Sequence, residues 1–115
     1  MLEATTRTID FPSTSQDVLT EILREGAQRL LTTAIEAALT CVGSCSACAD
    51  ACLHEDEVAD RRACIGANLD CADICATTAR VLSRHTGYDA NLTRTQLEAC
   101  AQACRSCAEE CAMHA

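Results

Sequence analysis

Apolar residues recur at helical spacing from Val18 onward, after a polar lead-in rich in Thr and Ser. A period of three to four residues is typical of an amphipathic α-helix. The pattern reaches Leu53 without a proline, and Gly26 either ends a short helix or lies inside a long one at a cost of about 1 kcal/mol. We favour one long first helix, whose apolar positions before the first cysteine are Val18, Leu19, Ile22, Leu23, Ala27, Leu30, Leu31, Ala34, Ile35 and Ala38.

Two more helices are predicted after an acidic break at residues 54–57. The second runs from about Val58 to His85, and Gly87 suits the position just after its end. Asn91 or Thr93 caps the third helix, which continues to the end of the chain. Because no segment alternates like a strand, we predict an all-α protein.

The chain divides into three predicted parts: a flexible N-terminal lead-in (1–15), an N-terminal helical extension (16–37) and a cysteine-rich helical bundle domain (38–115). Ser13, Thr14 and Ser15 follow Pro12 and offer capping side chains, and Asp17 favours a first turn.

Eleven cysteines fall on the three predicted helices as rows of four, three and four. The first and last rows share the spacings four, three and four, which place all members on one face of a helix at about 100° per residue. The rows are Cys41, Cys45, Cys48 and Cys52; Cys64, Cys71 and Cys75; and Cys100, Cys104, Cys107 and Cys111.

Three interpretations of these rows differ in chemistry. Cysteine is a small hydrophobe that suits a core, but this does not explain eleven cysteines in phase. Disulfides between neighbours on one helix constrain little, and an odd cysteine count fits a closed framework poorly. A redox C-x-x-C pair belongs at a helix N-terminus, where the thiol pKa falls, whereas Cys45/Cys48 and Cys104/Cys107 lie within helices.

Metal binding explains the rows best, since thiolates select soft ions such as Cu(I), zinc or iron–sulfur clusters. Zinc prefers closed four-ligand sites, usually on turns, and iron–sulfur clusters need cysteines that converge from loops. Cu(I) accepts two or three thiolates, and one sulfur can bridge two ions. The rows therefore favour storage of several Cu(I) ions per chain, with a Zn, Cd or Hg sequestration module or a thiol redox protein as alternatives.

Composition and motifs limit the partners, the cellular location and the activity that we expect. The net charge of −8 argues against nucleic acid and anionic membranes as partners. No uninterrupted apolar run of 18 residues and no secretory signal occur, so we expect no membrane helix and a reducing cytoplasmic location. No motif or acid–base pair poised for catalysis occurs, and we predict that the protein is not an enzyme.

Residues 38–115 resemble the cysteine-rich four-helix-bundle copper storage proteins of the cytosolic type, including an uncharacterised bacterial family often grouped with them. The matching stretches are CSACADACLHE (45–55), LDCADICATTAR (69–80) and CAQACRSCAEEC (100–111). This resemblance implies that all eleven cysteines ligate copper in a homo-oligomer, a dimer or tetramer. His54, Met113 and His114 are possible accessory ligands at the open end.

Two departures from the family affect the expected architecture. Family members continue after a segment like residues 111–114 into a last helix that we do not find here. We therefore expect an antiparallel bundle of the four-helix type, with a cysteine-lined core and a fourth wall from the N-terminal helix or from another subunit. Residues 17–36 also resemble the start of a mutator-type transposase, which implies no transposase activity because a catalytic domain has no room here.

Overall fold

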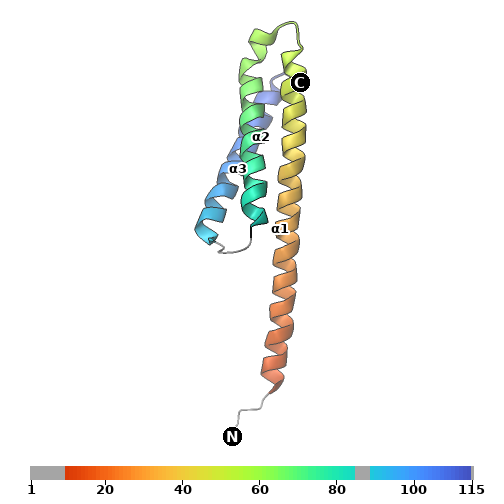
Figure 1. Cartoon of the computed structure of the whole chain (residues 1–115), viewed down its shortest axis with the longest axis vertical. Helices are drawn as coiled ribbons and strands as arrows, with labels where there is room; N and C mark the ends of the chain where they lie inside the picture. Colours follow the sequence, from red (N-terminus) through yellow and green to blue (C-terminus); the bar gives the residue numbers. More distant parts are fainter. Residues whose placement is uncertain (1–9, 85–88, 115) are drawn as a thin grey trace. The chain divides into compact units, whose positions relative to one another are not determined.

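The computed structural model describes residues 10–84 and 89–114, and within them the chain is helical with no strand, as predicted (Figure 1). The helices are α1 (Asp10–Leu53), the 3₁₀-helix η1 (Val58–Arg61), α2 (Arg62–Ser83) and α3 (Ala90–Ala112). Long helices with short connections follow from a chain with four glycines and one proline.

The chain forms two compact units, Met1–Thr33 and Ala34–Ala115, and α1 passes from the first into the second. The expectation of one long helix through Gly26 is confirmed. That helix begins at Asp10, inside the segment we expected to be a flexible lead-in. Pro12 is tolerated there because the first N–H groups of a helix have no helical partner.

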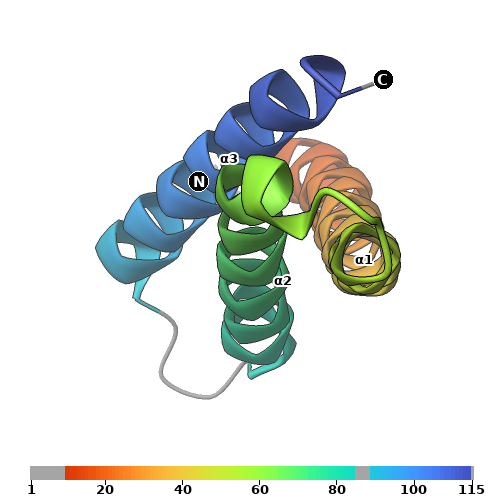
Figure 2. The same ribbon diagram turned by 90° about the horizontal axis from the view of Figure 1, so that it is seen from above.

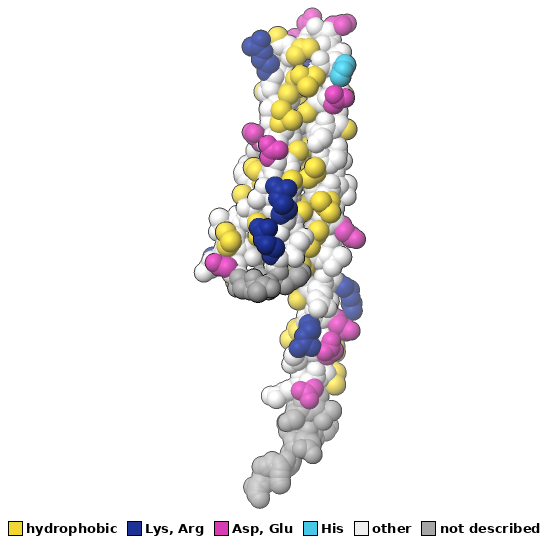
Figure 3. All heavy atoms as spheres, in the orientation of Figure 1, with side chains coloured by type: hydrophobic (Ala, Val, Ile, Leu, Met, Phe, Trp, Pro, Cys, Tyr) yellow, Lys and Arg dark blue, Asp and Glu magenta, His cyan; other side chains and the backbone are white. Residues whose placement is uncertain are grey.

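In the first unit, the described helix leaves most of its large apolar side chains in solvent. Val18, Leu19, Ile22, Leu23 and Leu30 are all more than half exposed, up to 74% for Leu30. Figure 3 shows Arg and acidic side chains beside apolar ones on this helix. One helix has no second surface on which to bury an apolar face.

In the second unit, α2 lies beside both α3 and the part of α1 that follows Thr33 (Figures 1 and 2). The buried apolar side chains are mostly small: Ala38, Cys45, Ala49, Cys52, Cys64, Cys71, Ala72, Cys75, Ala79, Leu82 and Cys107. Only Leu82 among them is a large hydrophobe. Small side chains let the helices approach closely, at the expense of the apolar area that usually stabilises a core.

The helix ends correct several details of the prediction. Residues 54–57 form the expected break, but the segment after it begins as η1, so α2 itself starts at Arg62 and not at Val58. The second helix ends at Ser83, and His85 and Gly87 lie outside the described residues.

The N-cap of α3 is Asp89, and the prediction of Asn91 or Thr93 was wrong. The Asp89 carboxylate accepts hydrogen bonds from the backbone N–H groups of Asn91 at 3.0 Å and Leu92 at 3.1 Å. Asp89 has extended backbone geometry, as an N-cap requires. Asn91 and Thr93 are already helical, and therefore their side chains cannot act as the cap.

We expected no membrane helix, but one helix meets the length and hydropathy criteria for one. The segment Ser15–Leu53 contains an 18-residue window of mean hydropathy 1.4, which by length and composition alone is enough to cross a bilayer. Sequence inspection missed it because polar residues interrupt every apolar run. Alanine and cysteine raise this mean, and some of them, such as Ala38 and Cys45, face the protein core. Only 11% of the window is buried.

Replacing the cap tests its contribution to stability. We expect Asp89→Ala to lower the free energy of unfolding of the reduced, metal-free protein by about 1 kcal/mol, because two N–H groups of α3 lose their acceptor. Urea unfolding followed by circular dichroism measures this loss. The matched control is Asp73→Ala, an exposed site within α2, and an equal loss in both variants would contradict the capping role.

Candidate metal centre

The three cysteine rows meet inside the second unit. All eleven cysteines are free thiols, and each has its sulfur within 4.0 Å of another cysteine sulfur. We call this set the thiol array. The shortest contact joins Cys41 of α1 to Cys71 of α2 at 3.2 Å. Contacts of this length between helices bring together ligands that are far apart in sequence.

Four of these sulfurs form the most compact group. We call it the four-thiol group: Cys41, Cys71, Cys75 and Cys104, whose sulfurs all lie within 4.8 Å of one another. One member comes from α1, two come from α2 at i and i+4, and one comes from α3. There are two further groups of three thiols. The first, Cys45, Cys71 and Cys107, shares Cys71 with the four-thiol group, and the second consists of Cys48, Cys52 and Cys64.

The last two cysteines extend the array. Cys100 lies 3.5 Å from Cys75, next to the four-thiol group. Cys111 lies 3.6 Å from Cys64 and 3.8 Å from Cys48, next to the second group of three. Sulfurs at these separations can bind one ion together or share a sulfur between two ions.

Burial keeps most of the thiols protonated. It raises the pKa of Cys64 and of Cys107 to about 12, helped by hydrogen bonds to neighbouring thiols. Burial raises the thiol pKa above the ordinary 9.0 also at Cys45, Cys48, Cys71, Cys75 and Cys104. A metal ion must therefore displace protons from these residues.

Two thiols differ from the others. At Cys41, burial raises the pKa, but hydrogen bonds from four neighbouring thiols outweigh it and the net shift is downward. At Cys111, burial is outweighed in the same way by hydrogen bonds from Asn68 and from three thiols, which lower the pKa. Each of these sulfurs accepts several hydrogen bonds as a thiolate, and this stabilises its charge.

Asn68 is a member of the site that sequence reasoning missed. It is 1% exposed, and its amide nitrogen donates to the sulfurs of Cys48 at 3.3 Å, Cys64 at 3.4 Å and Cys111 at 3.4 Å. Its amide oxygen accepts from the Cys107 thiol at 3.1 Å. The signal was present, because Asn68 completes the spacing four, three and four in the second row, between Cys64 and Cys71.

The spacing itself has a packing origin. Intervals of four and three residues repeat every seven residues, the pattern by which core positions of packed helices face one another. The cysteines thus occupy positions that leucine or isoleucine would fill in an ordinary bundle. Beyond Cys75, the next position is Thr78, which is 1% exposed and accepts a 2.8 Å hydrogen bond from the Gln96 amide. This polar pair follows the last thiols of α2.

The proposed accessory ligands are outside the thiol groups. His54 is exposed, with its Nδ1 2.8 Å from the backbone oxygen of Asp50. His114 Nε2 lies 3.4 Å from the Glu110 carboxylate, and Met113 is 70% exposed.

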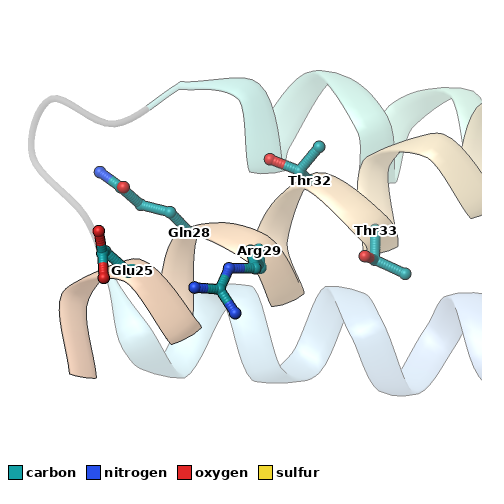
Figure 4. Close-up of a pocket in the computed structure, with 5 residues that line it drawn as sticks. All are labelled: Glu25, Gln28, Arg29, Thr32 and Thr33. Carbon is teal, nitrogen blue, oxygen red and sulfur yellow. The ribbon is translucent and has the colours of Figure 1, made fainter. Parts of the chain in front are cut away.

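A separate depression on the first unit is unrelated to this chemistry. Its walls are the polar side chains shown in Figure 4, Glu25, Gln28, Arg29, Thr32 and Thr33. They come from successive turns of α1 and include no sulfur or imidazole. A soft metal ion therefore has no ligands there.

Comparison with known proteins agrees with the thiol chemistry. A family model described as copper storage protein matches residues 27–115. A search of curated proteins gives no match. The resemblance of residues 17–36 to a transposase finds no support in these comparisons.

Comparison with solved structures also finds copper storage proteins. A cytosolic copper storage protein from Streptomyces lividans, with five coppers, is 57% identical, with a TM-score of 0.72 over 73% of this chain and 70% of that one. The copper storage protein of the same organism loaded with 10 copper equivalents is also 57% identical (TM-score 0.72), over 73% of this chain and 64% of that one. A histidine-to-alanine variant of the Streptomyces protein is 55% identical, with a TM-score of 0.74 over 76% and 72% of the two chains. The chain thus belongs to the copper storage protein family.

Proposed function

We propose that this protein stores several Cu(I) ions per chain in the cytosol and has no catalytic role. The observation that carries the proposal is the thiol array, in which eleven sulfurs from three helices form one connected set. Sulfurs 3.2 to 3.9 Å apart suit an ion that accepts two or three thiolates and shares them with its neighbours. The copper-loaded structures of the Streptomyces protein support the same function.

All eleven cysteines are the proposed ligands, and residues 38–115 are the proposed metal-binding domain. Residues 16–37 are a helical extension outside it. We assign His54, Met113 and His114 an accessory role at the end of the array near Cys52 and Cys111, where they lie close in sequence to the rows. The net charge of −8 disfavours nucleic acid and anionic membranes as partners.

The architecture we propose is an antiparallel bundle of the four-helix type. The contact of Cys52 with Cys64 and that of Cys41 with Cys71 support it, since residue numbers rise along α1 as they fall along α2. Between these helices the second unit has a groove of ≈ 430 Å³, lined by Ile35, Leu39, Val42, Ala76, Ala79, Arg80, Ser83 and Arg84. A fourth helix with an apolar face fits such a groove.

We propose that a second copy of the chain supplies this helix, which makes the protein a homo-oligomer. The first unit carries an exposed apolar face that includes Leu19 and Leu23. The groove is partly apolar, with Ile35, Leu39 and Val42 in its lining. The apolar face of the first unit of one copy therefore suits the groove of another, in a dimer or in a tetramer built from dimers.

Titration with copper tests the function. We expect the reduced, metal-free protein to take up several Cu(I) ions per chain tightly when it competes anaerobically with a Cu(I) chelator, since every thiol has a neighbouring thiol. Saturation at one or two Cu(I) ions, with zinc preferred, would show that the protein is not a copper store.

Copper uptake is expected to depend on pH. The seven thiols with a raised pKa are protonated below pH 9.0, so each one that becomes a ligand releases a proton. Apparent affinity should rise with pH by about tenfold per pH unit for each proton displaced. Chelator competition at several pH values, corrected for the chelator's own titration, measures this slope. A pH-independent affinity would mean that the thiols bind copper without losing protons.

Sedimentation velocity tests the homo-oligomer. Leu23→Glu adds a charge to the exposed apolar face of the first unit and is expected to shift the protein toward monomer. Gln28→Glu adds the same charge at an exposed polar position and should leave the assembly intact. A strictly monomeric unmodified protein, or equal dissociation of both variants, would refute the proposed partner surface.

A further inference from the structure

The geometry of the four-thiol group has a close match in metal chemistry. Five of its six sulfur–sulfur separations are 3.2, 3.6, 3.8, 3.9 and 3.9 Å, and the sixth, between Cys41 and Cys75, is below 4.8 Å. A zinc–sulfur bond of about 2.3 Å places the sulfurs of a regular tetrahedron about 3.8 Å apart. The group therefore has the dimensions of a closed tetrathiolate site.

The other thiol groups in the described part of the chain lack a fourth sulfur within the same radius. The second group of three, Cys48, Cys52 and Cys64, has Asn68 as its polar neighbour instead. An amide is a harder ligand than a thiolate and suits other ions. A preference for one tetrahedral ion is thus confined to the four-thiol group.

The surroundings of the four-thiol group also suit a structural zinc ion. Four thiolates complete a tetrahedral zinc site without water. Two of them, Cys71 and Cys75, are 1% and 0% exposed, and the other two thiols of the group are partly buried. Two thiols outside the group lie 3.5 Å from its members, Cys45 beside Cys41 and Cys100 beside Cys75. As S–H donors, they can hydrogen-bond the bound thiolates, as outer residues do in zinc sites.

We propose that the four-thiol group holds one Zn²⁺ ion per chain when copper is absent, and that Cu(I) displaces it during loading. Zinc binding releases four thiol protons and leaves a closed ZnS₄ centre that links α1, α2 and α3. Loading returns the Zn²⁺ to solution, because Cu(I) is the softer ion and its thiolates can bridge. This exchange rests on the proposed copper storage, whereas the zinc site itself does not.

Cobalt(II) is the probe, since tetrahedral tetrathiolate Co²⁺ absorbs strongly in the visible range and octahedral Co²⁺ does not. Titration of the reduced, metal-free full chain should give this spectrum with an end point of one Co²⁺ per chain. One equivalent of Zn²⁺ should abolish the spectrum by displacement. Subsequent Cu(I) should release the Zn²⁺ to a chromogenic zinc indicator.

Matched variants locate the site. Cys75→Ser and Cys104→Ser remove one ligand each and should abolish the tetrathiolate spectrum. They should weaken Zn²⁺ binding by more than the loss of an outer hydrogen-bond partner does, which is about 10–100-fold. Cys48→Ser, outside the four-thiol group, should keep both. Circular dichroism of each variant confirms that the helices remain.

The outcomes separate the zinc site from the store. The zinc site is refuted by a lack of tetrathiolate absorption, by its persistence in Cys75→Ser and Cys104→Ser, or by its loss in a helical Cys48→Ser protein. If many Cu(I) ions still bind in that case, the copper store stands without the zinc site. One bound Zn²⁺ with at most two Cu(I) ions would support the zinc site and refute the store.

Discussion

The second unit depends on the burial of sulfur at positions where other helical bundles bury large hydrocarbon side chains. Cys64, Cys71 and Cys75 are almost fully buried, yet each removes less apolar area from water than leucine would. In the proposed copper store, metal–thiolate bonds between helices would add the stability that such a core lacks, since binding energy at a site that folding assembles becomes part of the folding energy. The same residues would then serve as the core and as the site.

Because the cysteines occupy core positions, much of the fold could be predicted from their spacing along the chain. Cysteine rows at core spacing predicted helices, their relative faces and a shared thiol centre, because two rows with identical intervals and a third in the same phase leave few alternatives. The all-α fold followed from helical periodicity, and the break at residues 54–57 followed from its acidic residues. Periodicity favoured a continuous α1 but left a helix end at Gly26 open, and the structure shows that the helix continues. The cysteine positions suit both metal binding and the packing of helices, so two lines of reasoning support the same prediction of a helical thiol centre.

Other features depend on contacts that a linear pattern does not display. Asp89 was missed as a cap because the choice among Asp89, Asn91 and Thr93 depends on which backbone N–H groups remain free. Asn68 was missed because only cysteines were counted in the rows. The sulfur separations in the four-thiol group arise from the packing of three helices, and spacing within one helix does not determine them.

Asn68 has a consequence for a protein that must exist both empty and full. A thiol is a neutral hydrogen-bond donor, and it becomes a charged acceptor when a metal ion replaces its proton. A carboxamide stays uncharged at every pH. The two hydrogens of the Asn68 amide are shared among the Cys64 backbone oxygen at 2.9 Å and the sulfurs of Cys48, Cys64 and Cys111, and sulfur accepts from them both as a thiol and as a thiolate. At the amide oxygen the Cys107 thiol is the donor, and it loses that role when it is deprotonated. One end of Asn68 can therefore keep its partners when metal enters, whereas the other end must give one up if Cys107 becomes a ligand.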